Sequence, residues 1–285
     1  RQPKFSDEYV SLWVDQWALP QYSEFIAQFV LTFDEYLKHF QEINISLGPT
    51  GELRYPSYNY HDDGQYPNRG RMQCFSNPAK DDYFEWLKDF KNKDHASTTL
   101  FIKSSDLKSK FDNKSYKQSP DIKDFFEWYN YSLMNHGNRV LKIALDIIPE
   151  GIPIGFKIPG IHWMIKDPDM PRISEMTCGL INSESLDGRI SYYNSLKIVL
   201  KDLPVERFIL HFTCIEQKNS EKITDFSTGY SRPEDLLIEV SSAAKDLGLR
   251  IKGENSLSKN LVKPFAWLKI ESVISNGNYS GVTIM

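Results

Sequence analysis

The chain has 285 residues, enough for one large domain or two ordinary ones. Its net charge of −4 and its pI of about 5.9 provide no basic surface for nucleic acid or an anionic membrane. No apolar run reaches the roughly 18 residues that cross a bilayer, and residues 1–7 are polar, without the apolar core of a signal peptide. Cys74, Cys178 and Cys214 form no C-x-x-C pair, so we expect free thiols and a cytoplasmic protein.

The expected elements alternate between helices and strands along the chain. Apolar spacing predicts helices over residues 22–42, 79–91, 121–148, 191–202, 233–247 and 260–276. Short apolar runs predict strands over residues 43–47, 152–163, 207–216, 249–253 and 279–285. Residues 92–120 and 166–190 are expected to be irregular, and Ser231 is the expected N-cap before Pro233. This order is typical of an α/β fold with a parallel sheet.

Five strands are too few to close a barrel of eight, so the sheet is either open or part of something longer. In parallel α/β folds, functional groups gather at the carboxyl ends of the strands. Polar residues stand at four of these ends, namely Glu52; Lys157, His162 and Trp163; Thr213 and Glu216; and Glu254 and Asn255. We therefore expect them along one edge of the sheet.

Glu52 and Glu254 both follow glycine at a strand end, where a backbone can approach a ligand. Two carboxyl groups facing each other across a cleft suit glycoside hydrolysis, although either glutamate alone could equally be a surface or helix-terminal residue. The aromatic content of 13% fits either sugar stacking or a large core.

Other chemistries have less support in the sequence. His61, Asp62 and Asp63 cluster without a second histidine or cysteine at ligand spacing, so no metal site is expected. Neither G-x-S-x-G nor a glycine-rich phosphate loop is present, and Cys214 lies within an apolar strand.

Four stretches carry a resemblance to a known family: GPTGELRYPSY (48–58), KIPGIHW (157–163), FTCIEQ (212–217) and GENSL (253–257). In this order they resemble the motifs of the β-amylases, the inverting α-1,4-glucan maltohydrolases of glycoside hydrolase family 14. The resemblance spans about residues 8–285. It implies a (β/α)8 TIM barrel of which the chain covers strands four to eight, as one catalytic domain over residues 1–285 that is incomplete at both ends. It also implies a starch-like α-1,4-glucan substrate, maltose as product, and no cofactor.

The resemblance further implies a role for each matching residue. Glu52 would be the general acid and Glu254 the general base. Lys157 and His162 would bind glucose on the product side, and Trp163 would shape that subsite. Thr213 would lie on a mobile inner loop and keep the acid deprotonated after cleavage. Asn255 would bind near the base, and Leu257 would wedge into the glucan.

Several departures from the family pattern leave alternatives open. Ser256 stands where alanine is usual, Met164 where a second tryptophan is usual, and Thr50 where alanine is usual. An aspartate from the first three strands and an arginine after the eighth are absent, so we expect the chain by itself to be inactive. One alternative is an amylase-like sugar sensor or regulatory binding module. Another is a retaining hydrolase, whose carboxyl groups would be only about 5–5.5 Å apart.

Overall fold

A computed structural model describes residues 11–56, 72, 74–92, 101–103, 109–110, 114–182, 187–220, 230–276 and 279–284. Its strands are β1 (Ile43–Ile45), β2 (Ile154–Ile158), β3 (Phe208–Phe212), β4 (Arg250–Glu254) and β5 (Tyr279–Thr283). Its main helices are α1 (Asp15–Thr32), α2 (Asn77–Lys91), α4 (Pro120–Ile147), α5 (Ile173–Thr177), α6 (Gly188–Val199), α7 (Pro233–Asp246) and α8 (Pro264–Asn276). Four strands lie within the predicted runs and are shorter, whereas β4 is shifted by one residue from the predicted 249–253. None of the described helices is long and apolar enough to cross a membrane.

The strands form one parallel sheet in the order β1-β2-β3-β4-β5, which is also their order along the chain. A doubly wound sheet instead reverses its strand order at a switch point. Sequential parallel strands joined through helices are the arrangement found in a β/α barrel. The expected α/β fold with a parallel sheet is therefore confirmed.

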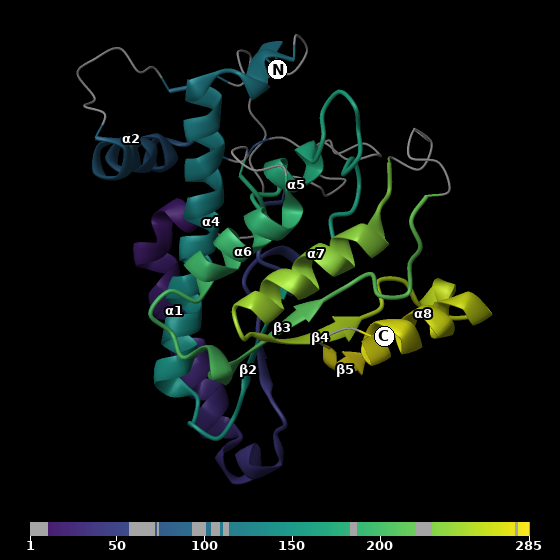
Figure 1. Cartoon of the computed structure of the whole chain (residues 1–285). Helices are drawn as coiled ribbons and strands as arrows, with labels where there is room; N and C mark the ends of the chain where they lie inside the picture. The colour runs from purple at the N-terminus through teal and green to yellow at the C-terminus, as the bar shows by residue number, and fades with distance from the viewer. Residues whose placement is uncertain are drawn as a thin grey trace.

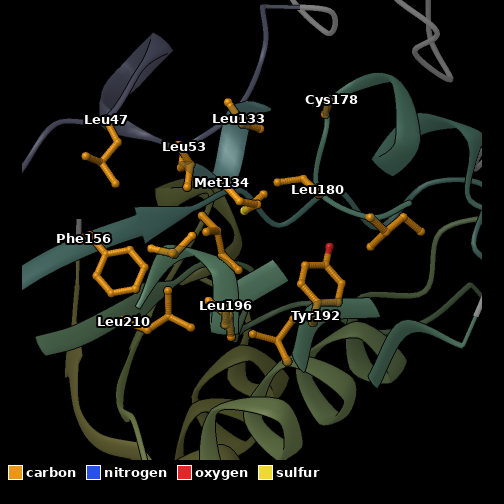
Figure 2. Close-up of a cluster of buried hydrophobic side chains, with 14 of the residues drawn as sticks. Leu47, Leu53, Leu133, Met134, Phe156, Cys178, Leu180, Tyr192, Leu196 and Leu210 are labelled. Atoms are coloured by element: carbon orange, nitrogen blue, oxygen red, sulfur yellow. The ribbon is translucent and has the colours of Figure 1, made fainter. Parts of the chain in front are cut away.

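The two faces of the sheet differ in chemistry because side chains alternate along a strand. One face carries Asn44, Lys157, His211 and Lys252. Lys157, His211 and Lys252 are level with one another in the strand register, and Asn44 is level with Gly155. The opposite face carries the apolar residues Ile154, Phe156, Ile158, Phe208, Leu210, Phe212 and Ile251, all buried. These pack against side chains from the helices, as Figure 2 shows for Phe156 and Leu210 beside Leu196 of α6.

The helices form a layer over this apolar face. In Figure 1, α6 and α7 run side by side across the sheet, and α4 stands next to α6 with α1 behind it. The long helix α4 buries many aromatic rings, among them Phe125, Trp128 and Tyr129. Much of the aromatic content of the chain therefore lies in the core rather than on a sugar-binding surface.

The first predicted helix, 22–42, is wrong at both ends. Helix α1 begins at Asp15, continues through Pro20 and ends at Thr32, and a 3-10 helix spans Asp34–His39. Ile26 is buried as expected, but Phe25 is 73% exposed. Apolar spacing alone does not place these ends, whereas in the structure α1 packs against α4 and continues through Pro20.

Two further expectations about loops are corrected. The irregular region 166–190 contains α5 and the first turn of α6. The N-cap of α7 is Arg232 rather than Ser231, because the Ser231 hydroxyl instead lies 2.9 Å from His162 Nδ1. Within 92–120, the described residues include a 3-10 turn at Ser115–Lys117, and much of the remainder lies outside the described residues.

Candidate active site at the carboxyl ends of the strands

Glu52 lies just beyond β1, at the end of a tight turn. A 3-10 helix, Pro49–Gly51, leads into it, and Thr50 within this turn has a φ of 57°, which is uncommon for a β-branched residue. A Cβ on Gly48 would lie 2.6 Å from the backbone oxygen of Glu52, so the turn requires glycine there. Glu52 then pairs with Lys157 in an isolated parallel bridge that continues the sheet edge.

The Glu52 carboxylate is contacted by polar groups from its own segment. Arg54 Nε donates to Glu52 Oε2 at 2.9 Å, and Thr50 Oγ1 lies 3.3 Å from the same oxygen. The Glu52 side chain is 19% exposed, whereas the Arg54 side chain is 1% exposed. Glu52 is therefore reachable from solvent, while the cation behind it is fully enclosed.

Glu254 is the last residue of β4 and is 4% exposed. Lys157 Nζ of β2 lies 2.9 Å from Oε1 and 2.7 Å from Oε2 of this carboxylate. Lys157 thus bridges with Glu52 through its backbone and with Glu254 through its ammonium group. The two glutamates come from positions about 200 residues apart and lie around one lysine.

The two carboxyl groups also influence each other electrostatically. Burial raises the pKa of Glu52, and the negative charge of Glu254 raises it further. The Arg54 charge and the hydrogen bonds from Arg54 and Thr50 oppose this rise without cancelling it. The pKa of Glu52 is therefore above that of an ordinary glutamate, which favours a carboxyl group that holds a proton.

The loop after β2 places His162 and Trp163. His162 is 6% exposed, and burial lowers its pKa to about 4, so the ring is neutral at neutral pH. Its Nδ1 is next to Ser231, and its backbone oxygen accepts from Arg232 N at 2.8 Å. The Trp163 ring lies beside it at a centroid distance of 4.5 Å. These contacts fix His162 between the β2 loop and the segment that leads into α7.

Thr213, Asn255 and Leu257 extend the same edge. Thr213 directly follows β3, and a Cβ on Gly160 would lie 3.2 Å from Thr213 Cγ2, so the loops after β2 and β3 are in close contact. Asn255 is fully buried behind Glu254, whereas the Leu257 side chain is 44% exposed. All eight residues expected at the site lie in the β1–β4 carboxyl-end segments. His61, Asp62 and Asp63 lie outside the described residues.

Glu216 was expected at a strand end, but without a role at the site. It is fully buried, and its carboxylate accepts hydrogen bonds from Ser256 N, Ser256 Oγ, Leu257 N and Asn260 Nδ2, at 3.0–3.1 Å. Gln217 also donates to Ser256 Oγ. The loop after β3 therefore holds the loop after β4 immediately beyond Glu254. The only signal in the sequence is an acid at the end of an apolar strand.

Comparisons with known proteins identify the family of the chain. The model of glycosyl hydrolase family 14 matches residues 4–285. A β-amylase from Medicago sativa is 32% identical over 276 residues, which is 89% of this chain and 51% of that protein. A thermophilic β-amylase from Thermoanaerobacterium thermosulfurigenes is 30% identical, over 99% of this chain and 50% of that protein. The chain thus spans about half the length of these curated relatives.

A solved structure gives the same result in three dimensions. The catalytic domain of β-amylase from Paenibacillus polymyxa superposes with a TM-score of 0.76 at 31% sequence identity, covering 94% of this chain and 62% of that one. The family match covers almost every residue, including the segments that bear both glutamates. The chain therefore belongs to glycosyl hydrolase family 14.

Proposed function

We propose that this chain forms part of a β-amylase-type hydrolase that releases maltose from the non-reducing ends of α-1,4-glucans such as starch. The observation that carries this proposal is the placement of Glu52 and Glu254 around Lys157 at the carboxyl edge of a parallel sheet. Family membership supports the class of reaction, and the different surroundings of the two carboxyl groups support their separate roles.

In this mechanism Glu52 is the general acid. Its raised pKa keeps a proton available for the glycosidic oxygen, and partial exposure leaves the carboxyl group accessible. As the bond to C1 breaks, the proton moves to the leaving oxygen and Glu52 becomes a carboxylate. Arg54, at 2.9 Å, then stabilises the new negative charge. Thr213, on the neighbouring loop, would help to hold the deprotonated acid.

Glu254 is the general base. It takes a proton from a water molecule that attacks C1 from the opposite face of the ring, which inverts the anomeric configuration. An inverting pair needs roughly 6.5–9.5 Å between its carboxyl groups to accommodate that water. Lys157 contacts the Glu254 carboxylate and, with His162, would bind hydroxyl groups of the product-side glucose.

The remaining residues would position the chain of sugars. Trp163 would form one wall of the product-side subsite, Asn255 would bind beside the base, and the exposed Leu257 would insert between glucose units at the cleavage point. Neutral His162 can both donate and accept, as a sugar hydroxyl requires.

The test is maltose release from soluble starch by the full-length protein, with NMR detection of the first-formed anomer. We expect β-maltose, and loss of at least about 1,000-fold in kcat for Glu52→Gln and Glu254→Gln. Glu271→Gln, on the exposed side of α8, is the matched control and should retain full activity. The α-anomer would indicate a retaining hydrolase. Maltose binding without turnover in the unsubstituted protein would indicate a sugar sensor.

A further inference from the structure

The loop after β2, residues 159–172, carries His162 and Trp163 and is closed by a backbone hydrogen bond at its base. Met164, the residue after Trp163, accepts this bond through its backbone oxygen from Arg172 N at 2.6 Å. Met164 and Arg172 both have a φ of 59°, in the left-handed region that residues other than glycine seldom occupy. Such a conformation persists only where the surrounding structure holds it. The base of the loop therefore requires contacts that fix it.

The side chain of Arg172 lies between two carboxylates that provide these contacts. Its Nε and Nη2 atoms donate to Glu175 of α5, both at 2.8 Å, and its Nη1 and Nη2 atoms donate to Glu239 of α7 at 3.0 and 2.7 Å. The side chains of Arg172 and Glu175 are 3% and 0% exposed, and that of Glu239 is 21% exposed. Tyr192 of α6 also donates to Glu175 Oε1, at 2.9 Å. The guanidinium group thus joins the base of the loop to α5, α6 and α7.

Helix α7 holds the same loop at a second point. Arg232, its N-cap residue, donates its backbone N–H to His162 O at 2.8 Å. Glu239 follows about two helical turns later in α7 and contacts Arg172. One helix therefore fixes the loop at His162 and at Arg172, on either side of Trp163.

Two other roles explain this cluster less well. Arg172 and Glu175 are too deeply buried to touch a substrate, so they cannot act on it directly. Stability alone is a weak reason for a buried ion cluster, because the cost of burying charges often equals or exceeds their attraction, and packed apolar side chains serve as well. The rigid fork of a guanidinium group does, however, allow only one arrangement of the carboxylates around it. The cluster is therefore suited to fixing the position of the loop.

We propose that Arg172 is a positioning residue, which holds the loop after β2 so that His162 and Trp163 keep their places at the product-side subsite. The link to the subsite is the bond from Arg172 N to Met164 O, directly after Trp163. That this loop forms a product-side subsite rests on the proposed function. Loosening Arg172 removes no group that contacts the sugar, so it should weaken binding of substrate and transition state alike and leave the chemical step unchanged.

The test uses the full-length protein, labelled with ¹⁵N-tryptophan, and two variants of the cluster. Glu239→Gln removes one carboxylate charge and leaves Glu175 on Arg172, whereas Arg172→Lys keeps the positive charge and loses the paired N–H groups. Arg189→Lys is the matched control. Arg189 of α6 also pairs with α7, at Asp246, but this pair is exposed and Arg189 has no hydrogen bond to the loop among the described residues.

Four quantities are compared between these proteins, and thermal unfolding is measured in parallel. They are the indole N–H resonance of Trp163, assigned from Trp163→Phe, the Kd for maltose, and KM and kcat on soluble starch. In Glu239→Gln and Arg172→Lys we expect the Trp163 resonance to move before any sugar is added. Kd and KM should rise about fivefold to tenfold, while kcat stays within about twofold. Arg189→Lys should leave all four unchanged.

The outcomes separate positioning from stability, and this inference from the proposed function. If the unfolding temperature falls while the Trp163 resonance, Kd and KM stay constant, the cluster only stabilises the fold, so the inference is overturned and the proposed function stands. If the unsubstituted protein neither binds nor releases maltose, the proposed function is overturned, and the Trp163 resonance in the variants still decides whether Arg172 holds the loop. If Arg172→Lys does not fold, Glu239→Gln decides alone, because Glu239 is partly exposed and Arg172 keeps Glu175.

Discussion

Burial raises the pKa of Glu52, the charge of Arg54 opposes this rise, and that charge can be removed by the substitution Arg54→Met. The Arg54 Nε atom lies 2.9 Å from Glu52 Oε2, and the side chain is 1% exposed, so solvent screens this pair little. Two unit charges about 4 Å apart interact by about 4 kcal/mol at an effective dielectric constant of 20. At 1.36 kcal/mol per pKa unit, this corresponds to about 3 units as an upper bound. We expect the pKa of Glu52 to rise by about 1–3 units.

The direct assay is a ¹³C NMR titration of the Glu52 carboxyl group, assigned from Glu52→Gln. In the full-length enzyme the proposed acid must be protonated, so the alkaline limb of kcat/KM should move upward by the same amount. Arg54→Lys keeps the positive charge and should move the pKa far less. Near-unchanged thermal unfolding in both variants would confirm that the fold is intact. A Glu52 pKa that stays constant or falls in Arg54→Met would refute the reasoning.

Three further predictions concern stability. In Gly137→Ala, the new Cβ would lie 2.7 Å from Leu53 Cδ2. The cost of this overpacking, about 1–3 kcal/mol, should outweigh the gain in helix propensity of about 1 kcal/mol, so urea denaturation should show a less stable protein. Gly151→Ala, with open space around the new Cβ, is the control. Glu216→Gln should cost about 2–4 kcal/mol of unfolding free energy, and near-neutral denaturation would contradict its role between the loops. The pKa of His162 is 6.5 in the unfolded chain and about 4 in the folded protein, because burial disfavours the charged ring. Its contribution to the unfolding free energy is therefore complete above pH 6.5, and about 3 kcal/mol is lost as the pH falls to about 4. His162→Gln should reduce the dependence of the unfolding free energy on pH over that range, and an unchanged dependence would exclude His162 as its cause.

The strands were predictable because parallel strands such as β2 and β3 are buried along almost their whole length and so read as short apolar runs between glycine and polar residues. The helix boundaries were less predictable, since tertiary contacts decide them. Helix α5 has only five residues, and its position depends on Arg172, which donates to Glu175 at 2.8 Å and to Glu239 of α7 at 2.7 Å. A local pattern cannot predict α5, because its position depends on Glu239, which is 67 positions from Arg172.

In the candidate site, too, features set by nearby residues were predictable from the sequence, and features set by distant residues were not. Strand-end position was enough to select Glu52 and Glu254, because strand direction fixes where such residues gather. The pairing of Lys157 with Glu254 depends on register, which a single sequence does not give. Glu216 was expected at a strand end, but its role could not be predicted, because its four donors come from residues 256–260 and only folding brings that segment to it.

The surroundings of the two glutamates therefore have different origins. Glu52 takes its cation from Arg54, two residues along the chain, so a single turn sets its electrostatic environment. The cation beside Glu254 is Lys157, and the pairing of the strands places it there. Lys157 of β2 is level with His211 of β3, and His211 is level with Lys252 of β4, two residues before Glu254. A shift of one residue in β2 would turn Lys157 to the opposite face and remove its ammonium group from Glu254. One turn of the chain is thus enough to form the environment of the proposed acid, whereas the environment of the proposed base forms only when β2, β3 and β4 are in register.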